Sequence, residues 1–287
     1  MKKGCFSLVA ILVTALTLPA LGQTSESSVR LMTLNIAHAR ADGGSQLLQS
    51  EAKARINLDK IAEVINREQP DIVAFQEIDN NSFWNGRFDH GQLIADKTNF
   101  THWFTGSHQL SNNLDYGTGL MSRFDMLDPL SVTFTKPLAR TRKGFVLSTI
   151  EWPNTDGIKV DLVSLHLDFL SHSQRRKEID VLTNTLLQSE NLLIVMGDFN
   201  MEYDKSELLQ KLAATLNLHA WRPDEDQLVT YRRLGKRLDW VLVSEEFDFN
   251  AHQVLNDPLS DHQAVMVDVS LREEQLTFDE PELMVGQ

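Results

Sequence analysis

Between residues 29 and 271 the chain is a succession of short strand-like runs with few helix-like segments between them. Residues 30–37, RLMTLNIA, alternate apolar and polar positions, and residues 191–200, NLLIVMGDFN, begin as a continuous apolar run typical of a buried strand. Apolar residues recur at helical spacing in three segments: 58–65, 179–186 and 209–216. No repeat or Pro/Gly/Ser-rich linker interrupts the pattern. It predicts one α/β domain with two packed sheets and helices outside them.

The first 22 residues differ from the rest of the chain. Lys2 and Lys3 precede an apolar stretch from Cys5 to Leu18, and the small-residue ending Ala-Leu-Gly follows at 20–22. This is the pattern of a secretory signal peptide. The apolar stretch is shorter than the roughly 20 residues that a membrane-spanning helix needs. We therefore expect cleavage rather than anchoring, and an exported chain, periplasmic or extracellular, without a transmembrane segment.

The remaining chain divides into a domain, 23–271, and an acidic C-terminal tail, 272–287. Cys5 is the only cysteine, so the exported chain is expected to fold without a disulfide. The formal net charge is −13. Such a charge repels polyanions at a distance, although a local basic pocket or a bound cation can reverse its sign.

Many of the predicted strands begin or end with a polar residue suited to chemistry. These residues are Asn35, Glu77, His166, Asp168, Asp198, Asn200, Asp239, Asp261 and His262. Each alone has an ordinary structural explanation, such as a turn, a surface ion pair or a satisfied core histidine. Together they predict a site where the strand ends converge, which is where ligands often bind in sheet proteins.

The order of these motifs resembles the endonuclease/exonuclease/phosphatase superfamily, which includes deoxyribonucleases, apurinic endonucleases, sphingomyelinases and inositol-polyphosphate phosphatases. The motifs, from residue 33 to residue 265, are TLNIA, DIVAFQEID, YGTGLMSR, LVSLHLD, MGDFN, RLDWVLVS and LSDHQAV. The resemblance covers roughly residues 29–271. It implies a four-layer α/β sandwich, in which two packed mixed β-sheets are flanked by helices, and metal-dependent cleavage of phosphate esters.

The resemblance also implies roles for individual residues. Glu77 corresponds to the metal ligand, Asn35 supports it through its amide oxygen, and Asp261 matches a position sometimes placed in the metal shell. Hard oxygen ligands with no cysteine suit Mg²⁺ or Mn²⁺ better than zinc.

Five further residues are implied to be catalytic. Asp198 orients or activates the attacking water, and Asn200 holds that water or a phosphoryl oxygen. His262 is the catalytic histidine, Asp239 its partner, and His166 a donor to the phosphoryl group. Whether Asp198 or His262 activates the water stays open.

Three residues are predicted to bind substrate: Tyr116, Thr118 and Arg142. Many relatives have an asparagine where this chain has Thr118, which leaves that phosphate contact unsettled. Basic residues form only short islands, at 140–143, 175–176 and 231–237, whereas proteins that bind a duplex usually have a broad basic face. This pattern favours a small phosphate ester or a lipid head group as the substrate.

Two other functions stay open at this stage. One is a secreted nuclease that acts on DNA or RNA. The other is a non-catalytic binding module on the same fold, which is disfavoured because every residue expected of an active member is present. The sequence makes no prediction of the oligomeric state.

Overall fold

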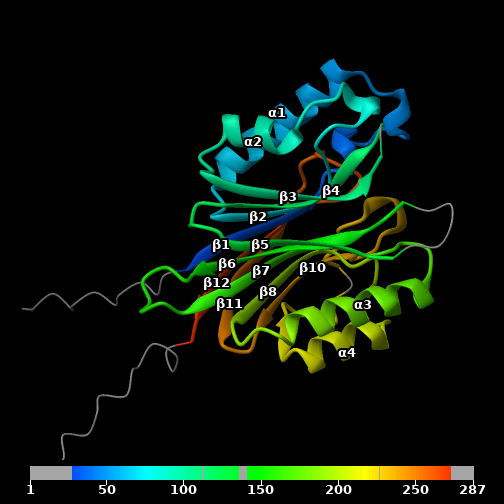
Figure 1. Cartoon of the computed structure of the whole chain (residues 1–287). Helices are drawn as coiled ribbons and strands as arrows, with labels where there is room; N and C mark the ends of the chain where they lie inside the picture. The colour runs from blue at the N-terminus through cyan, green and yellow to red at the C-terminus, as the bar shows by residue number, and fades with distance from the viewer. Residues whose placement is uncertain (1–27, 112, 136–140, 226, 273–287) are drawn as a thin grey trace, which may run out of the picture.

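The computed structural model describes residues 28–111, 113–135, 141–225 and 227–272. The predicted signal peptide, and the acidic tail beyond Arg272, lie outside the described residues. In the described part of the chain, two six-stranded mixed sheets pack face to face between two layers of helices, α1 and α2 on one side and α3 and α4 on the other (Figure 1). The prediction of a four-layer α/β sandwich is confirmed.

The two sheets have matching designs. The first has the order β11 (Phe247–Val254), β12 (Val265–Leu271), β1 (Val29–Asn35), β2 (Ile72–Asp79), β4 (Asp115–Ser122), β3 (His102–Leu110). The second has the order β5 (Leu127–Thr133), β6 (Gly144–Glu151), β7 (Lys159–His166), β8 (Leu192–Asp198), β10 (Asp239–Ser244), β9 (Leu218–Ala220). Each contains one parallel pair, β1–β2 and β7–β8, and its other pairs are antiparallel.

Helical crossovers join the strands of both parallel pairs. The helices are α1 (Glu51–Glu68), α2 (His90–Lys97), α3 (His172–Leu186) and α4 (Glu207–Thr215), and four short 3₁₀ turns lie in loops: η1 (Ala37–Ala39), η2 (Gln46–Leu48), η3 (Phe83–Asn85) and η4 (Arg232–Leu234). α1 connects β1 to β2, and α3 connects β7 to β8. Because the two strands of each pair run parallel, their carboxyl ends lie at the same edge of the sheet.

The local sequence explains where α1 begins and ends. The Ser50 side chain accepts a hydrogen bond from the Lys53 amide, which caps the first turn. At the other end Gln69 adopts a left-handed conformation (φ 53°), and Pro70 cannot continue the helix. The helix buries Leu58 and Ile61 in the core against the first sheet. Each such aliphatic side chain contributes about 1.5–3 kcal/mol when fully buried.

Buried polar side chains join the two sheets near the carboxyl ends of their parallel strands. Gln76 of β2 donates to Ser164 of β7 at 3.1 Å and to Thr33 of β1 at 3.2 Å, and Ser164 donates to the Phe75 carbonyl at 2.8 Å. Apolar side chains fill the rest of the space between the sheets. These bonds fix how the strand ends of one sheet lie against those of the other, so they also fix the geometry of the region beyond them.

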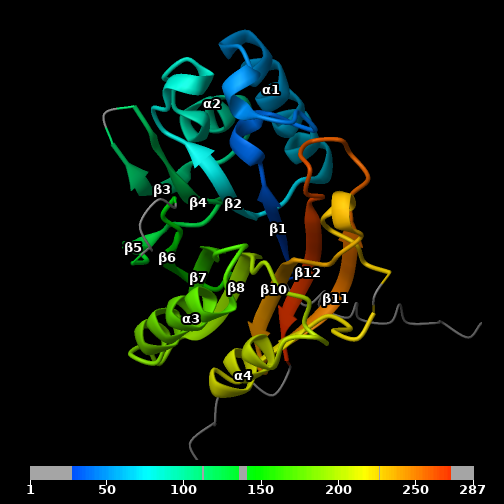
Figure 2. The same ribbon diagram turned by 90° about the vertical axis from the view of Figure 1, so that its right-hand side faces the viewer.

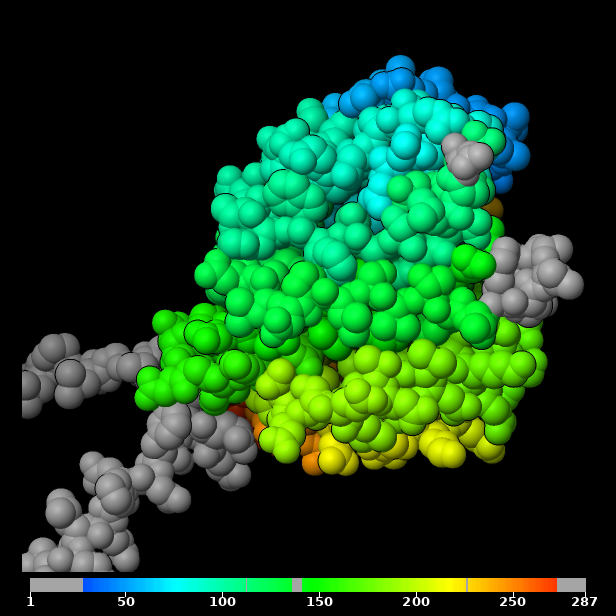
Figure 3. Space-filling view, in the orientation of Figure 1, coloured from blue at the N-terminus to red at the C-terminus, as the bar shows by residue number. Residues whose placement is uncertain are grey.

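The molecule forms one continuous body, with the helical layer of the N-terminal half at the top in the orientation of Figure 3 and the α3–α4 layer at the bottom. Among the described residues no helix is both long and apolar enough to cross a membrane. Strands predicted at 30–37, 71–78, 158–168 and 191–200 are present with shifted ends. The short helix α2 was not predicted, because it buries only four residues and shows little periodicity.

Two buried histidines make the fold sensitive to acid. Burial lowers the pKa of His90, at the start of α2, to about 4, and that of His108, on β3, to about 3. In the unfolded chain both titrate near about 6.5, so below that pH the unfolded state binds more protons than the folded state. The free energy of unfolding should therefore decrease from about pH 6.5 towards 4, by roughly 2.7 kcal/mol per pH unit from these two groups.

Urea unfolding at several pH values tests this expectation. The variant His108→Gln should remove roughly 1.4 kcal/mol per pH unit of the slope, because one titrating group is gone. The partly exposed His102 on the same strand is the matched control for the histidine-to-glutamine change, because its ring is not enclosed by the core. Equal slopes in wild type and His108→Gln would show that His108 is not buried as a neutral imidazole.

Candidate active site

The candidate site lies where the two parallel pairs end. Asn35 is the last residue of β1, His166 the last of β7 and Asp198 the last of β8, and Glu77 sits in a bulge near the end of β2. Asp239 begins β10, which runs antiparallel to β8 and places it directly opposite Asp198. Since His166 lies opposite Asp198 on the other side, the register alone sets three of these residues in one row across the second sheet.

A pocket of about 320 Å³ opens beyond this row. Seven of the predicted site residues line it: Asn35, Glu77, His166, Asp198, Asn200, Asp261 and His262. The loops that follow the strands supply the rest of its wall, including Arg40, Phe169, Tyr231 and Leu234. These loops lie together at one end of the molecule (Figure 2). The expected convergence of strand ends is therefore present in the structure.

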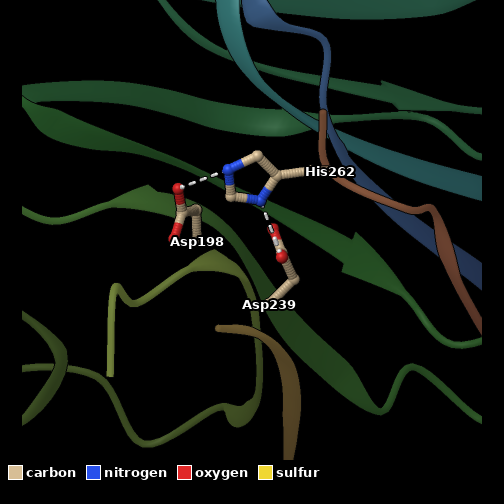
Figure 4. Close-up of side chains that lie close together, drawn as sticks. All are labelled: Asp198, Asp239 and His262. Carbon is tan, nitrogen blue, oxygen red and sulfur yellow. Dashed lines mark hydrogen bonds and ion pairs between the residues drawn. The ribbon is translucent and has the colours of Figure 1, made fainter. Parts of the chain in front are cut away.

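His262 lies between two carboxylates (Figure 4). Its Nδ1 donates to Asp239 Oδ2 at 2.8 Å, and its Nε2 is 3.7 Å from Asp198 Oδ2. Burial alone would lower the pKa of His262, but the carboxylates of Asp239 and Asp198 outweigh burial and raise it to about 10. Thr230 Oγ1 also donates to Asp239 Oδ2 at 2.6 Å and holds that carboxylate in place. The predicted pairing of Asp239 with His262 is thus formed, with a protonated ring at neutral pH.

Asp198 is the most enclosed carboxylate that faces the pocket. Its Oδ2 accepts from Asn35 Nδ2 at 3.1 Å, and its Oδ1 accepts from the Asn200 amide at 3.0 Å. Burial raises the pKa of Asp198 to about 7, with the nearby Asp239 acting in the same direction. A carboxylate with that pKa is a much stronger base than an exposed aspartate, which suits proton abstraction near neutral pH.

Asn200 shapes the turn after β8. It has φ 52°, and its Nδ2 donates to the Leu167 carbonyl at 2.9 Å. Asparagine tolerates this left-handed conformation better than most residues. The backbone amide and the side chain of Asn200 thus stabilise the turn that holds Asp198 in the pocket.

Glu77 is surrounded by cationic and imidazole groups. Its Oε1 accepts from Lys143 Nζ at 3.1 Å, and its Oε2 is 3.5 Å from His38 Nε2. Burial alone would raise the pKa of Glu77, but Lys143, His38 and His166 hold it well below its usual range. The Glu77 carboxylate is therefore charged across the ordinary pH range.

His166 lies between Asp198 and Lys143, the lysine that pairs with Glu77. Its Nδ1 accepts from Lys143 Nζ at 3.2 Å, and its Nε2 lies 3.4 Å from Asp198 Oδ2. Burial and the adjacent Lys143 lower the pKa of His166 well below its usual value, so the ring is neutral with its proton on Nε2. His166 lines the pocket as well as facing Asp198, so a role as donor to a phosphoryl group stays a prediction.

Two groups of side chains offer ligands to a divalent cation. One is the predicted set around Glu77 and Asn35; in the other, one donor atom from each of Asp198, Asp239 and His262 lies within 4.8 Å of the others. His262 Nδ1 is already bonded to Asp239 Oδ2, but Asp239 Oδ1 is buried with no hydrogen-bond partner among the described residues. The carboxylate and amide oxygens in these groups are ligands of the kind that bind Mg²⁺ and Mn²⁺.

Asp261 also lines the pocket and lies close to two arginines. Arg40 donates to Asp261 Oδ2 at 2.8 Å, and Arg233 lies 3.9 Å from the same oxygen. The structure thus ties the predicted third metal residue to two arginines at the pocket wall.

The three predicted substrate-binding residues lie together beside the main pocket. Tyr116, Thr118 and Arg142 line a small cavity of about 10 Å³ that shares Glu77 and His166 with the main pocket. Thr118 is fully buried, and its hydroxyl lies 2.8 Å from His108 Nε2. The hydroxyl of Thr118 is thus hydrogen-bonded to His108 in the structure.

Sequence reasoning missed His38, Lys143, Arg40 and Phe169. Lys143 belongs to a basic island for which a solvated surface was one interpretation, yet its side chain is only 7% exposed and bridges Glu77 and His166. His38 lies three residues after Asn35, in a loop with no periodic pattern. Of these four residues, only Lys143 could have been found from the sequence, because it lies at a strand end like the predicted site residues: it directly precedes β6.

The family model for the endonuclease/exonuclease/phosphatase family matches residues 32–262. The chain belongs to this family. The match spans every residue of the candidate site, from Asn35 to His262. No curated protein matches the chain significantly in sequence.

Solved structures of this family share the fold at low sequence identity. The catalytic domain of human nocturnin with bound sulfate is 22% identical, with a TM-score of 0.64, covering 85% of this chain and 95% of that one. A mannosyl-6-phosphatase from Bacteroides thetaiotaomicron is 15% identical, with a TM-score of 0.65 and coverage of 85% and 100%. Danio rerio TDP2 in complex with a single-stranded DNA product has 15% identity, a TM-score of 0.64 and the same coverage.

Family membership settles the general chemistry. Members are hydrolases of the phosphoesterase and nuclease type that use a divalent metal. The residues brought together at the strand ends fit that chemistry, because they combine a fixed acid–base pair with oxygen ligands for a cation.

Proposed function

We propose that the protein is an exported, divalent-metal-dependent phosphoesterase that hydrolyses a small phosphodiester or phosphomonoester by in-line attack of water. The observation that carries the proposal is that Asp198 and His262 line one pocket of about 320 Å³ together with Glu77, while Asp239 holds His262 from behind. Export to a periplasm or the extracellular space rests on the sequence pattern of residues 1–22.

The chain's own residues divide the chemistry between them. Asp198, with its pKa raised to about 7, accepts a proton from the attacking water. His262 presents a positively charged Nε2–H to the pocket, where it stabilises the negative charge that develops on the phosphoryl oxygens or protonates the leaving oxygen. Asp239 keeps the ring oriented through Nδ1. Glu77 and Asn35 would hold a divalent cation, Mg²⁺ or Mn²⁺ in this proposal, which would supply further charge neutralisation when bound.

The shape and lining of the pocket favour a small substrate. A volume of about 320 Å³ is at the low end for sites that enclose a small molecule. Phe169 and Leu234 line it although both are largely exposed, with exposed fractions of 60% and 65%. An apolar group on the alcohol side of the ester would bury these side chains. This favours a small organic phosphate ester or the head group of a lipid.

One observation supports a nuclease as the second candidate. An exposed aromatic ring such as Phe169 at the mouth of a phosphate site is suited to stack on a nucleic-acid base. TDP2, which has the same fold, is seen with single-stranded DNA. The overall charge of −13 weighs against a long polyanion.

Hydrolysis by residues 23–287 with Mg²⁺, Mn²⁺ or EDTA tests the proposal. The substrates are bis-(p-nitrophenyl) phosphate, p-nitrophenyl phosphate, a phospholipid, RNA and plasmid DNA, with His262→Ala as the control. Metal-dependent cleavage of a small ester or the lipid, lost in the variant and with DNA intact, is expected. Nicking of the plasmid that is lost in His262→Ala would establish the nuclease instead.

A further inference from the structure

His38 is placed by an unusual stretch of backbone. Ala37, His38 and Ala39 all have left-handed conformations, with φ of 48°, 55° and 57°. Such conformations are unfavourable for residues with a Cβ, and they persist where surrounding contacts hold them. The Ala37 amide donates to Asn35 Oδ1 at 3.0 Å, and Asn57 Nδ2 donates to the Ala39 carbonyl at 2.8 Å. The turn therefore directs His38 into the interior beside the end of β2.

The ring of His38 joins two carboxylates from β2. Its Nδ1 lies 3.0 Å from Asp79 Oδ2, and its Nε2 lies 3.5 Å from Glu77 Oε2. The side chain is only 6% exposed, and Asp79 is fully buried. Since an acceptor faces each ring nitrogen, both can act as donors.

Other contacts fix the ring and its partner. The ring of His38 packs edge-on against Tyr116 at 4.6 Å and against Trp84 at 5.0 Å between centroids. Trp84 Nε1 donates to Asp79 Oδ1 at 3.2 Å, so both oxygens of Asp79 have partners. His38 has little freedom to move away from Glu77.

Glu77 itself requires such support. It has φ 53° and sits in a β-bulge, so the sheet ladder does not fix its side chain. Its Oε1 is held by Lys143 and its Oε2 faces His38. Partners of this kind, one shell behind a metal ligand, orient the ligand and change metal affinity about 10–100-fold.

We propose that His38 is a positioning residue: anchored by Asp79, it orients the Glu77 carboxylate for a divalent cation. This rests on the metal role of Glu77 in the proposed function. His38 touches no reacting group and acts only through Glu77. The contacts that join Asp79, His38 and Glu77 are distinct from those that join Asp239, His262 and Asp198.

Two substitutions separate this role from simple support of the loop. In His38→Asn the amide nitrogen replaces Nδ1 and keeps the contact with Asp79 but cannot reach Glu77. In His38→Gln the amide nitrogen replaces Nε2 and keeps the contact with Glu77. Asparagine also tolerates the left-handed backbone better than glutamine. If His38 only supports the loop, the asparagine variant should be closer to wild type than the glutamine variant in both melting temperature and Mn²⁺ affinity.

The measurement is Mn²⁺ binding by titration calorimetry, together with thermal unfolding. We expect His38→Asn to raise the Kd for Mn²⁺ about tenfold or more while melting close to wild type, and His38→Gln to stay within about threefold of the wild-type Kd. Equal affinities in both variants and wild type, or better binding by the asparagine variant, would overturn the proposal, as would a wild type that binds no Mn²⁺. Normal Mn²⁺ binding with the expected order but no ester hydrolysis would support it and refute the proposed function.

Discussion

Replacing Asp198 with asparagine is expected to lower kcat about a thousandfold, because a positioned general base contributes about 10²–10⁴ to the rate. Asparagine has nearly the same shape and can keep one bond within the Asn35–Asp198–Asn200 group, but it cannot accept a proton from water. The side chain is buried and its pKa is raised to about 7, so the loss should be largest at and above neutral pH, where the wild-type carboxylate is ionised. Steady-state kinetics on the best substrate of the panel measures the effect.

The matched control for this variant is Asp161→Asn. Asp161 is a buried aspartate on β7, near the opposite end from His166, and its Oδ1 accepts from Thr149 and Asn191. Its replacement should lower the melting temperature without a comparable loss of kcat. If Asp198→Asn keeps more than about a tenth of the wild-type kcat, Asp198 is not the base, and His262 becomes the candidate for water activation.

Replacing Glu77 with glutamine is expected to weaken Mg²⁺ and Mn²⁺ binding by about 10–100-fold or more, and activity should recover in part at high metal concentration. The neutral amide loses the charge that attracts the cation. It also leaves the buried Lys143 without its carboxylate, so some loss of stability should accompany the change. Calorimetric titration with Mn²⁺ and the metal dependence of kcat measure both effects.

Glu202 provides a close control for Glu77. Its side chain is 17% exposed against 18% for Glu77, and it pairs with Lys236 at 3.0 Å, much as Glu77 pairs with Lys143 at 3.1 Å. Glu202 does not line the pocket that contains Asp198 and His262. Glu202→Gln should therefore leave metal binding unchanged. Equal Mn²⁺ affinity in the Glu77 and Glu202 variants would remove Glu77 from the metal site.

Much of the site could be predicted because strand ends are visible in the sequence. An apolar run that stops at Asp198, or one that ends near His166, marks both the strand and the polar group it presents. Carboxyl ends of parallel strands meet at one edge of a sheet, so several such groups are expected to converge. The pocket that contains seven of the predicted residues confirms that expectation.

The contacts of individual residues were harder to predict. His166 was predicted to donate to a phosphoryl oxygen, and the structure adds contacts with Asp198 and Lys143 that the sequence did not predict. Thr118 was predicted to bind substrate, and the structure adds a contact between its hydroxyl and His108 that the sequence did not predict. Both outcomes depend on side chains from strands far apart in the sequence, and no local pattern reveals which of them meet.

The sequence by itself determined the sandwich, the strand order along the chain and the set of polar residues at the strand ends, since periodicity and strand termini are local properties. Only the tertiary structure decided that Asp239 lies opposite Asp198, that Lys143 lies against Glu77, and that a left-handed turn brings His38 between Asp79 and Glu77. The physical reason is that sheet register, burial and a strained turn are fixed by contacts between distant segments, whose free energy appears only when the whole fold forms.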